Sequence, residues 1–261
     1  MNQKQYIKAI VIGSEIYFRT FALADNMYHH DGAIEWIVPL PGEKGPAIVY
    51  KVECSAMVEE EIDRLIPDIQ AGIVPSLWVL TPCSQPEKVS DILIKKGFKD
   101  ITDREHPEYG MAMDMDVLAN LPQSSKMVEI REVESISEFS TWVNVVNEAL
   151  HGWELLTTEH YCIWLEREEY TFYLGFLNGI PVCTAATIKD GSKASLEFVS
   201  TLKEYRKNGV AYAVCLKALQ ELHKNGVEIV TLRSSFEAIK LYEKLGFKPY
   251  YEQQLFSFQE A

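Results

Sequence analysis

The sequence contains two copies of one pattern, 149 residues apart, and this repeat restricts the chain to folds that can be built twice. Each copy has two strand-like runs, followed by a helix-like run that ends in Gly-Phe-Lys. Three elements that match at one spacing, without gaps, predict two consecutive copies of the same fold, although two such units can also resemble each other by chance. The matching segments are 47–52 with 196–201, 78–81 with 227–230, and 91–99 with 240–248.

The spacing of apolar residues predicts a mixed α/β sheet in each copy. In the C-terminal copy, alternating apolar residues indicate strands, and apolar residues three or four apart indicate helices. Asn178-Gly179 is a hairpin signal between two of these strands. Because strands and helices interleave, we expect a mostly antiparallel sheet flanked by helices. The predicted strands are 127–131, 170–176, 180–188, 195–201, 227–232 and 250–258, and the predicted helices are 135–150, 209–223 and 235–245.

A polar stretch at residues 121–126, which contains Pro122, is typical of a linker between the two copies. The expected organisation is therefore tandem, with one domain at residues 1–120 and a second domain at residues 127–261.

Composition narrows the classes of function. The net charge of −13 disfavours broad electrostatic binding to nucleic acid or to an anionic membrane. The longest apolar runs are much too short to span a bilayer. The five cysteines are scattered and form no CxxC motif, which argues against disulfides and a zinc site and predicts a reducing cytoplasm.

A strand, a short loop and a long helix follow one another between residues 195 and 223 and predict a phosphate-binding site. The loop has the pattern Arg-x-x-Gly-x-Ala, formed by Arg206, Gly209 and Ala211. The first turn of a helix has free N–H groups and a partial positive charge. Small residues let a phosphate approach this backbone closely. Three basic residues between 203 and 207 make the loop locally positive, which suits a pyrophosphate.

A second pattern follows one strand later, where the helix-like run at 235–247 contains Leu241-Tyr242 and then Leu245-Gly246-Phe247. Together with the Arg-x-x-Gly-x-Ala loop, this pattern resembles the GNAT superfamily of acyl-CoA N-acyltransferases, over about residues 129–258. The resemblance implies acetyl-CoA as co-substrate, no metal, and a degenerate GNAT-like fold in the N-terminal copy.

The resemblance also implies which residues bind the coenzyme. In the family, the strand before the loop pairs with the pantetheine arm, the loop holds the pyrophosphate, and the tyrosine of the last helix often acts as general acid. Tyr242 stands in that place, and its alternative role is a packed aromatic. Family members often have Asn where Ser235 stands; serine can cap the helix, but its reach is shorter. The implied coenzyme-binding residues are Val199, Ser200, Thr201, Arg206, Lys207, Asn208, Gly209, Val210, Ala211 and Ser235.

The sequence indicates the general base less specifically than it indicates the coenzyme-binding residues. The implied reaction is direct attack of a neutral amine on the thioester, with the oxyanion stabilised by a strand N–H, so a base must first remove the ammonium proton. Glu197 is the candidate base because the period-two rule places it on the same strand face as Val199; the alternative is a solvated strand residue. His151 and His160 fall where the family contacts its acceptor, but both are expected to be surface histidines.

The N-terminal copy lacks the residues expected to bind a coenzyme. At the same spacing, residues 206–211 correspond to residues 57–62, which contain three glutamates and no glycine, and Tyr242 corresponds to Leu93. Three carboxylates would repel a pyrophosphate. We therefore expect a non-catalytic copy that helps to shape the acceptor site, or one that only stabilises the protein.

The sequence thus predicts an acetyl-CoA-dependent N-acetyltransferase that acts on a small-molecule or peptide amine. The alternative is an acyl-CoA-binding sensor or interaction module without turnover. The candidate partners are an amine acceptor and a second copy of the chain in a homodimer, with neither nucleic acid nor a membrane among them.

Overall fold

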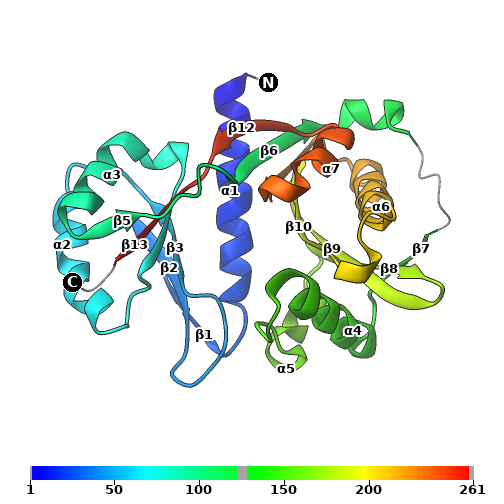
Figure 1. The fold of residues 1–261 in the computed structure, drawn as a ribbon, viewed down its shortest axis with the longest axis horizontal. Helices are drawn as coiled ribbons and strands as arrows, with labels where there is room; N and C mark the ends of the chain where they lie inside the picture. The colour runs from blue at the N-terminus through cyan, green and yellow to red at the C-terminus, as the bar shows by residue number, and fades with distance from the viewer. Residues whose placement is uncertain (1, 123–127, 259–261) are drawn as a thin grey trace.

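The structure, a computed structural model, describes residues 2–122 and 128–258 and has two β-sheets on either side of one long helix (Figure 1). This helix, α1 (Gln3–Phe21), begins after Asn2, whose side-chain oxygen accepts a hydrogen bond from the Gln5 amide at 3.0 Å. The Gln5 side chain in turn accepts a hydrogen bond from the Asn2 amide at 2.8 Å. This capping box satisfies backbone donors that would otherwise lack partners at the helix start.

The N-terminal half builds most of the first sheet, in which the described strands run in the order β1-β2-β3-β4-β13-β5. β3 and β4 are parallel, and the other neighbours are antiparallel. Helices α2 (Val58–Gln70) and α3 (Pro86–Lys95) cover the face that points away from α1 (Figure 1). The strands are β1 (Met27–His30), β2 (Ile34–Pro39), β3 (Ile48–Val52), β4 (Leu77–Leu80), β5 (Phe98–Asp100) and β13 (Gln254–Phe258).

The second sheet has the strand order β12-β6-β11-β10-β9-β8-β7. α1 and α4 (Ile136–Val146) pack on one of its faces, and α6 (Val210–Lys224) and α7 (Ile239–Lys244) pack on the other. The strands are β6 (Tyr109–Asp114), β7 (Glu129–Glu132), β8 (Tyr170–Leu177), β9 (Ile180–Asp190), β10 (Lys193–Thr201), β11 (Ile229–Ser234) and β12 (Lys248–Glu252).

The two sheets follow one plan, which confirms the tandem mixed α/β fold predicted from the repeat. A run of antiparallel strands leads to one parallel pair in each sheet: three strands (β1 to β3) lead to β3–β4 in the first, and four (β7 to β10) lead to β10–β11 in the second. The spacing of 149 residues between the two copies is wrong for one pair of helices. Helices α2 and α6 begin at Val58 and Val210, so these equivalent elements are 152 residues apart rather than 149.

The two halves exchange their last strands. β6 from the N-terminal half lies between β11 and β12, and β13 from the end of the chain lies between β4 and β5. The single strand predicted at 250–258 is therefore wrong, because the chain breaks at Gln253 and its two parts join different sheets. Buried Gln253 stabilises this crossing point, since its backbone amide donates to the Glu108 carbonyl at 2.9 Å and its side chain donates to the Glu108 carboxylate at 3.2 Å.

The strand exchange crosses the predicted domain boundary. Most of the predicted linker at 121–126, namely residues 123–126, lies outside the described residues, as does residue 127, the expected start of the second domain. The limits 1–120 and 127–261 stay a prediction, and each sheet contains one strand from the other side of that boundary.

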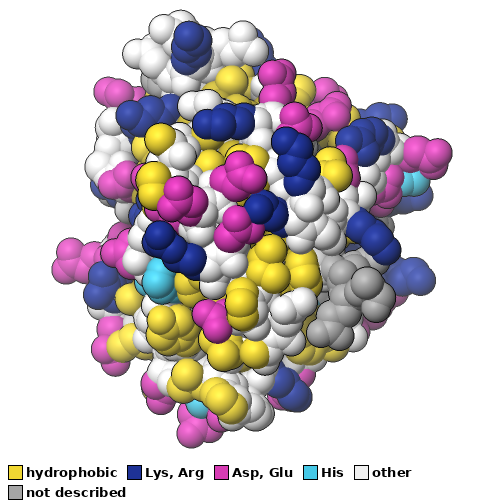
Figure 2. Space-filling view, turned by 90° about the vertical axis from the view of Figure 1, so that its left-hand side faces the viewer, with side chains coloured by type: hydrophobic (Ala, Val, Ile, Leu, Met, Phe, Trp, Pro, Cys, Tyr) yellow, Lys and Arg dark blue, Asp and Glu magenta, His cyan; other side chains and the backbone are white. Residues whose placement is uncertain are grey.

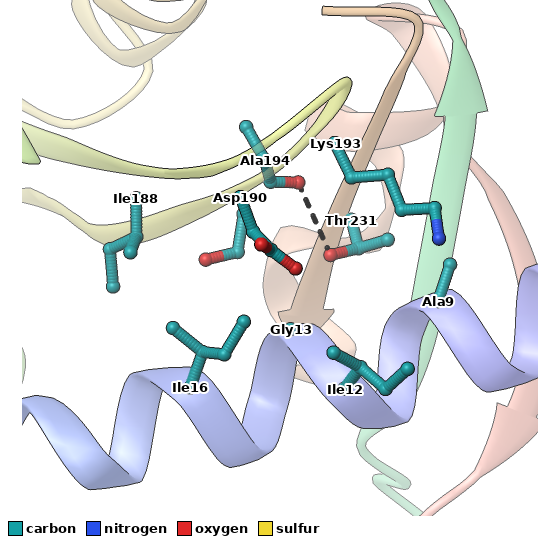
Figure 3. Close-up of a pocket in the computed structure, with 10 residues that line it drawn as sticks. Ala9, Ile12, Gly13, Ile16, Ile188, Asp190, Lys193, Ala194 and Thr231 are labelled. Carbon is teal, nitrogen blue, oxygen red and sulfur yellow. Dashed lines mark hydrogen bonds between the residues drawn. The ribbon is translucent and has the colours of Figure 1, made fainter. Parts of the chain in front are cut away.

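Helix α1 approaches the second sheet closely at Gly13 (Figure 3). A Cβ atom on residue 13 would lie 2.5 Å from Thr231 Oγ1 on β11, so a glycine is required at this distance. Ile12 and Ile16 flank Gly13 and point from the helix toward the strands (Figure 3). The cavity that remains is about 10 Å³, room for about one water molecule.

An aromatic core joins the two halves. Phe18 and Phe21 of α1 belong to the same buried cluster as Trp142 of α4 and Phe198 of β10. The rings of Phe198 and Trp142 are 5.2 Å apart, and those of Phe198 and Phe21 are 6.2 Å apart. One face of the C-terminal sheet is therefore completed by a helix from the N-terminal half.

Candidate active site

Strands β10 and β11 separate part of the way along their length. Within the described residues, their parallel ladder starts at Lys193 opposite Ile229 and ends at Ser195 opposite Thr231. β10 continues to Thr201 while it remains paired with β9 on its other side. Residues 199–201, the predicted pantetheine-binding segment, lie beyond the last pair, on the side where β10 has left β11.

A bulge in β10 changes which side chains share a face. The register with β9 shifts between Glu197 and Ser200, and Phe198 has a φ of +50°. Phe198 consequently packs in the aromatic core with α1, while Val199 packs against the opposite core beneath α6. The expectation that Glu197 and Val199 share a face is therefore wrong, because a bulge breaks the period-two alternation. Such a positive φ costs a non-glycine residue about 1 kcal/mol or more.

The Glu197 side chain is held inside the protein beside the separation of the strands. The residue is only 7% exposed, so the alternative of a solvated strand residue is wrong. Burial raises the pKa of its carboxyl to about 7, and the guanidinium of Arg233 partly opposes this rise. The Arg233 Nη2 and Glu197 Oε2 atoms are 3.9 Å apart. A carboxyl with a pKa near neutrality can take up and release a proton at physiological pH.

The loop after β10 has two residues in the left-handed region, Lys207 at a φ of +61° and Gly209 at +79°. Successive turns of this kind point backbone N–H groups into a common concavity that suits an anion. A Cβ atom built on Gly209 meets no atom within 4 Å, so the space in front of this residue is open. The Arg206 side chain braces the loop, since Nε donates to the Thr201 carbonyl at 3.0 Å and Nη2 donates to the Ala149 carbonyl at 3.1 Å.

Helix α6 begins at Val210, within one residue of its predicted start at 209. The amide of Ala213 donates to the Gly209 carbonyl at 3.1 Å, which closes the first turn of the helix. The amides of Val210 and Ala211 precede that turn, so helix geometry points them along the axis, out of the helix. This arrangement and the open Gly209 loop fit a pyrophosphate group.

Ser235 and Tyr242 belong to the segment that follows β11. The predicted helix 235–245 is split into a 3₁₀ turn at Phe236–Ala238 and α7. Ser235 occupies the N-cap position with extended backbone, but its side chain makes no cap hydrogen bond, contrary to the expected capping role. Tyr242 is 5% exposed, and burial raises the pKa of its hydroxyl well above the ordinary value. The hydroxyl therefore keeps its proton at neutral pH.

The equivalent helix of the N-terminal half has an acidic start. Glu59, Glu60 and Glu61 lie in the first turn of α2, and Met57 at the N-cap makes no side-chain cap hydrogen bond. With the three-residue correction, Met57 stands where Gly209 stands in the other half. Negative charges at a helix start favour the helix itself but oppose the binding of a second anion.

The two histidines that were expected on the surface, His151 and His160, are both only partly exposed. His151, expected on the surface, is half-buried at the end of a π-helical turn (Asn147–His151), and burial lowers its pKa. Its Nε2 atom has no hydrogen-bond partner in the described part of the chain. His160 contacts Asp25 with 2.6 Å between Nδ1 and Oδ1, so it lies at a polar contact between the two halves.

Sequence reasoning missed Arg233, Tyr17 and Phe18, which all lie near Glu197. Arg233 stands among the buried residues of β11, and a charge in such a strand is the one signal that pointed to it. Tyr17 and Phe18 gave no signal, because aromatic residues on a buried helix usually belong to a core.

No helix within residues 2–122 and 128–258 is long and apolar enough to cross a membrane. In these same ranges, no group of three His, Cys, Asp or Glu side chains is placed to hold a metal ion.

Comparison with known proteins agrees with this geometry. Residues 128–247 match the family described as "Acetyltransferase (GNAT) family", whereas no curated protein matches the sequence. A GCN5-related N-acetyltransferase from Kribbella flavida has a TM-score of 0.69 at 16% identity, over 97% of this chain and 96% of that one. A GCN5-related N-acetyltransferase from Sphaerobacter thermophilus has a TM-score of 0.62 at 14% identity, over 100% and 95%.

A tandem GNAT protein from the clavulanic acid biosynthesis pathway has a TM-score of 0.61 at 11% identity, over 97% of this chain and 88% of that one. At such identities the structures establish the shared fold, and the family match covers the half that contains the strand separation and the loop. Residues 128–247 therefore form a domain that matches the acetyltransferase (GNAT) family, and the chain as a whole shares the fold of tandem GNAT proteins.

Proposed function

We propose that the protein transfers an acetyl group from acetyl-CoA to an amine by direct attack. One observation carries this proposal: the separation of β10 from β11 has the loop with Lys207 and Gly209 beyond its open end and a buried carboxyl near its apex. The loop offers backbone donors at the start of α6, and the Glu197 carboxyl has a pKa of about 7. The backbone donors suit the phosphates of the coenzyme, and the carboxyl suits removal of a proton from an ammonium group.

The residues of the chain divide into binding and proton-transfer roles. Bound acetyl-CoA supplies an activated acetyl thioester. Glu197 accepts the proton of the acceptor ammonium, and Tyr242 donates a proton to the departing thiolate. A backbone N–H of β10 stabilises the developing oxyanion. The coenzyme is held by Val199, Ser200 and Thr201 at the pantetheine arm, by Arg206, Lys207, Asn208, Gly209, Val210 and Ala211 at the phosphates, and by Ser235.

The N-terminal half is proposed to act without a coenzyme of its own. The acidic first turn of α2 opposes pyrophosphate binding, and α1 covers the face of the second sheet on which Glu197 lies. We propose that this half shapes the acceptor site for a small-molecule or peptide amine. A cytoplasmic location is also proposed, because all five cysteines are free.

The test is thiol release from acetyl-CoA over a panel of amines, with wild type and Tyr242→Phe. We expect Tyr242→Phe to lower kcat about 100-fold, because the leaving thiolate loses its proton donor. The affinity for coenzyme A, measured by calorimetry, should be unchanged. Tyr173→Phe removes another buried tyrosine hydroxyl from the same core and should keep full activity.

Two results would contradict the proposal. Unchanged turnover in Tyr242→Phe would remove this residue as the acid. Tight binding of coenzyme A without thiol release for any amine of the panel would favour the second candidate, an acyl-CoA sensor. The unfilled cap at Ser235, where the family often has Asn, is the observation that keeps this candidate in view.

A further inference from the structure

Within the described part of the chain, Glu197 is paired with one cation, and that cation comes from the neighbouring strand. Arg233 follows Thr231 on β11 with a spacing of two, just as Glu197 follows Ser195 on β10. Because Ser195 and Thr231 are opposite each other, Arg233 and Glu197 point to the same face of the sheet. Their separation of 3.9 Å allows charge attraction but is too long for a hydrogen bond. The position of the guanidinium therefore determines how strongly it acts on the carboxyl.

The guanidinium rests on two aromatic rings of the N-terminal half. Its central carbon lies 4.4 Å from the ring centroid of Tyr17 and 4.5 Å from that of Phe18. Both distances are within the range of a cation–π interaction. The Nε atom of Arg233 is buried and has no hydrogen-bond partner within the described residues. The contacts that hold this side chain include the two rings of α1, a polar interaction with the Tyr17 hydroxyl and the charge of the Glu197 carboxyl.

We propose that Arg233 is a positioning residue for the Glu197 carboxyl, and that Tyr17 and Phe18 hold Arg233 in place. The inference rests on the proposed role of Glu197 as base. A cation at this distance favours the ionised carboxylate, which is the form that accepts a proton from an ammonium group. The N-terminal half then contributes to proton transfer without touching the coenzyme.

The other groups that face Glu197 are hydroxyls. Within the described residues, they are Ser195 on its own strand and Tyr17 on α1, and Tyr251 on β12 lies near Arg233. Tyr242 on α7 interacts with the charge of Glu197 from the opposite face of the sheet. Burial raises the pKa of Tyr17 to about 12 and the pKa of Tyr242 well above its ordinary value. These hydroxyls are uncharged at neutral pH. A change of charge at Arg233 therefore acts on the pKa of Glu197 while none of these neighbours gains or loses a proton.

The test measures the protonation of Glu197 directly and needs no acceptor. The full-length protein is labelled with ¹³C at the glutamate carboxyls, and Glu197 is identified by the signal that Glu197→Gln removes. We expect the wild-type midpoint near pH 7. Arg233→Gln should raise the midpoint by about one pH unit, a tenfold change in proton affinity, because the favourable charge is lost. Arg233→Lys, which keeps a charge, should raise it less.

A second variant tests the contribution of the N-terminal half. Tyr17→Leu combined with Phe18→Leu removes both rings and should also raise the midpoint, because Arg233 is no longer held. If the double variant does not fold, Tyr17→Leu alone should give a smaller rise. Arg131→Gln is the matched control, because the Arg131 guanidinium lies 4.5 Å from the centre of the Phe176 ring, on the edge strand β7 of the same sheet. It should leave the Glu197 midpoint unchanged.

Each part of the inference can fail separately. An unchanged midpoint in Arg233→Gln would overturn the positioning role. If the Glu197 midpoint shifts in Arg233→Gln but not in the variants that lack the Tyr17 and Phe18 rings, the proposed contribution of α1 is wrong. Full turnover of an accepted amine by Glu197→Gln would instead overturn Glu197 as the base, whatever the midpoints show.

Discussion

Glu197 combines a proposed chemical role with a cost to stability. Burial raises the pKa of its carboxyl from the ordinary 4.5 to about 7, so the folded protein binds this proton more tightly than the unfolded chain does. A group with a raised pKa contributes stability below its unfolded pKa, and that contribution is lost as the pH rises through its folded pKa. The contribution of Glu197 to the free energy of unfolding is therefore lost between about pH 4.5 and about pH 7.

We expect Glu197→Gln to gain stability relative to wild type as the pH rises from about 5 to about 8. Glutamine does not ionise, so the variant avoids the free-energy cost of keeping an ionised carboxylate buried at high pH. The relative gain has an upper limit of about 3 kcal/mol. Urea unfolding of both proteins at the two pH values measures it. If the two proteins differ in free energy of unfolding by the same amount at both pH values, the Glu197 carboxyl does not titrate between them.

At the scale of one element, the start of α6 depends on the backbone that precedes it. Gly209 has a φ of +79°, a conformation that an L-residue adopts at a cost of about 1 kcal/mol or more. The space where its Cβ would lie is open, so the cost comes from the backbone and not from a clash. Val210, the first residue of the helix, packs in the same core as Val199 of β10.

Gly209→Ala should lower the affinity for coenzyme A about tenfold, because the methyl group enters the space where a phosphate would approach. Stability should fall by about 1 kcal/mol. Gly179→Ala is the matched control, since Gly179 has a φ of +78° and equally open space in the β8–β9 hairpin. It should lose similar stability but keep the affinity, as measured by calorimetry and urea unfolding. An equal loss of affinity in both variants would show that the Gly209 loop does not bind the phosphates.

For the whole molecule, the exchange of β6 and β13 ties the two halves together. Each sheet contains an inner strand from the other half, and that strand pairs on both of its edges. The shared aromatic core around Phe198 adds a second connection. Neither half alone can therefore complete its sheet, so the tandem arrangement is a single folding unit.

We expect cleavage of the chain within residues 123–126 to leave a complex of two fragments. A protease site is introduced there and cut without denaturant, and the fragments should elute together in gel filtration because each half holds a strand in the sheet of the other. Either fragment expressed alone should aggregate, since the exchange would leave unpaired edges in both sheets. Two fragments that separate as folded monomers would contradict the exchange.

The sequence alone determined the features that depend on local patterns. Apolar periodicity located β8, β9, β10 and α6 to within about two residues, because side-chain spacing reflects the period of each element. The repeat identified two copies of one fold. The loop with Gly209 was found in the same way, since a positive φ beside a helix start requires a residue type that is visible in the sequence.

Only the tertiary structure decided the features that depend on residues far apart in the chain. Residues 250–258 have a continuous strand pattern, yet β12 and β13 belong to different sheets, because pairing partners are not encoded in periodicity. The bulge at Phe198 reversed the expected face of Val199 relative to Glu197. The placement of Arg233 on Tyr17 and Phe18 likewise depends on α1, more than 200 residues away, packing against β11. Local spacing sets what an element is, whereas long-range packing sets what it touches.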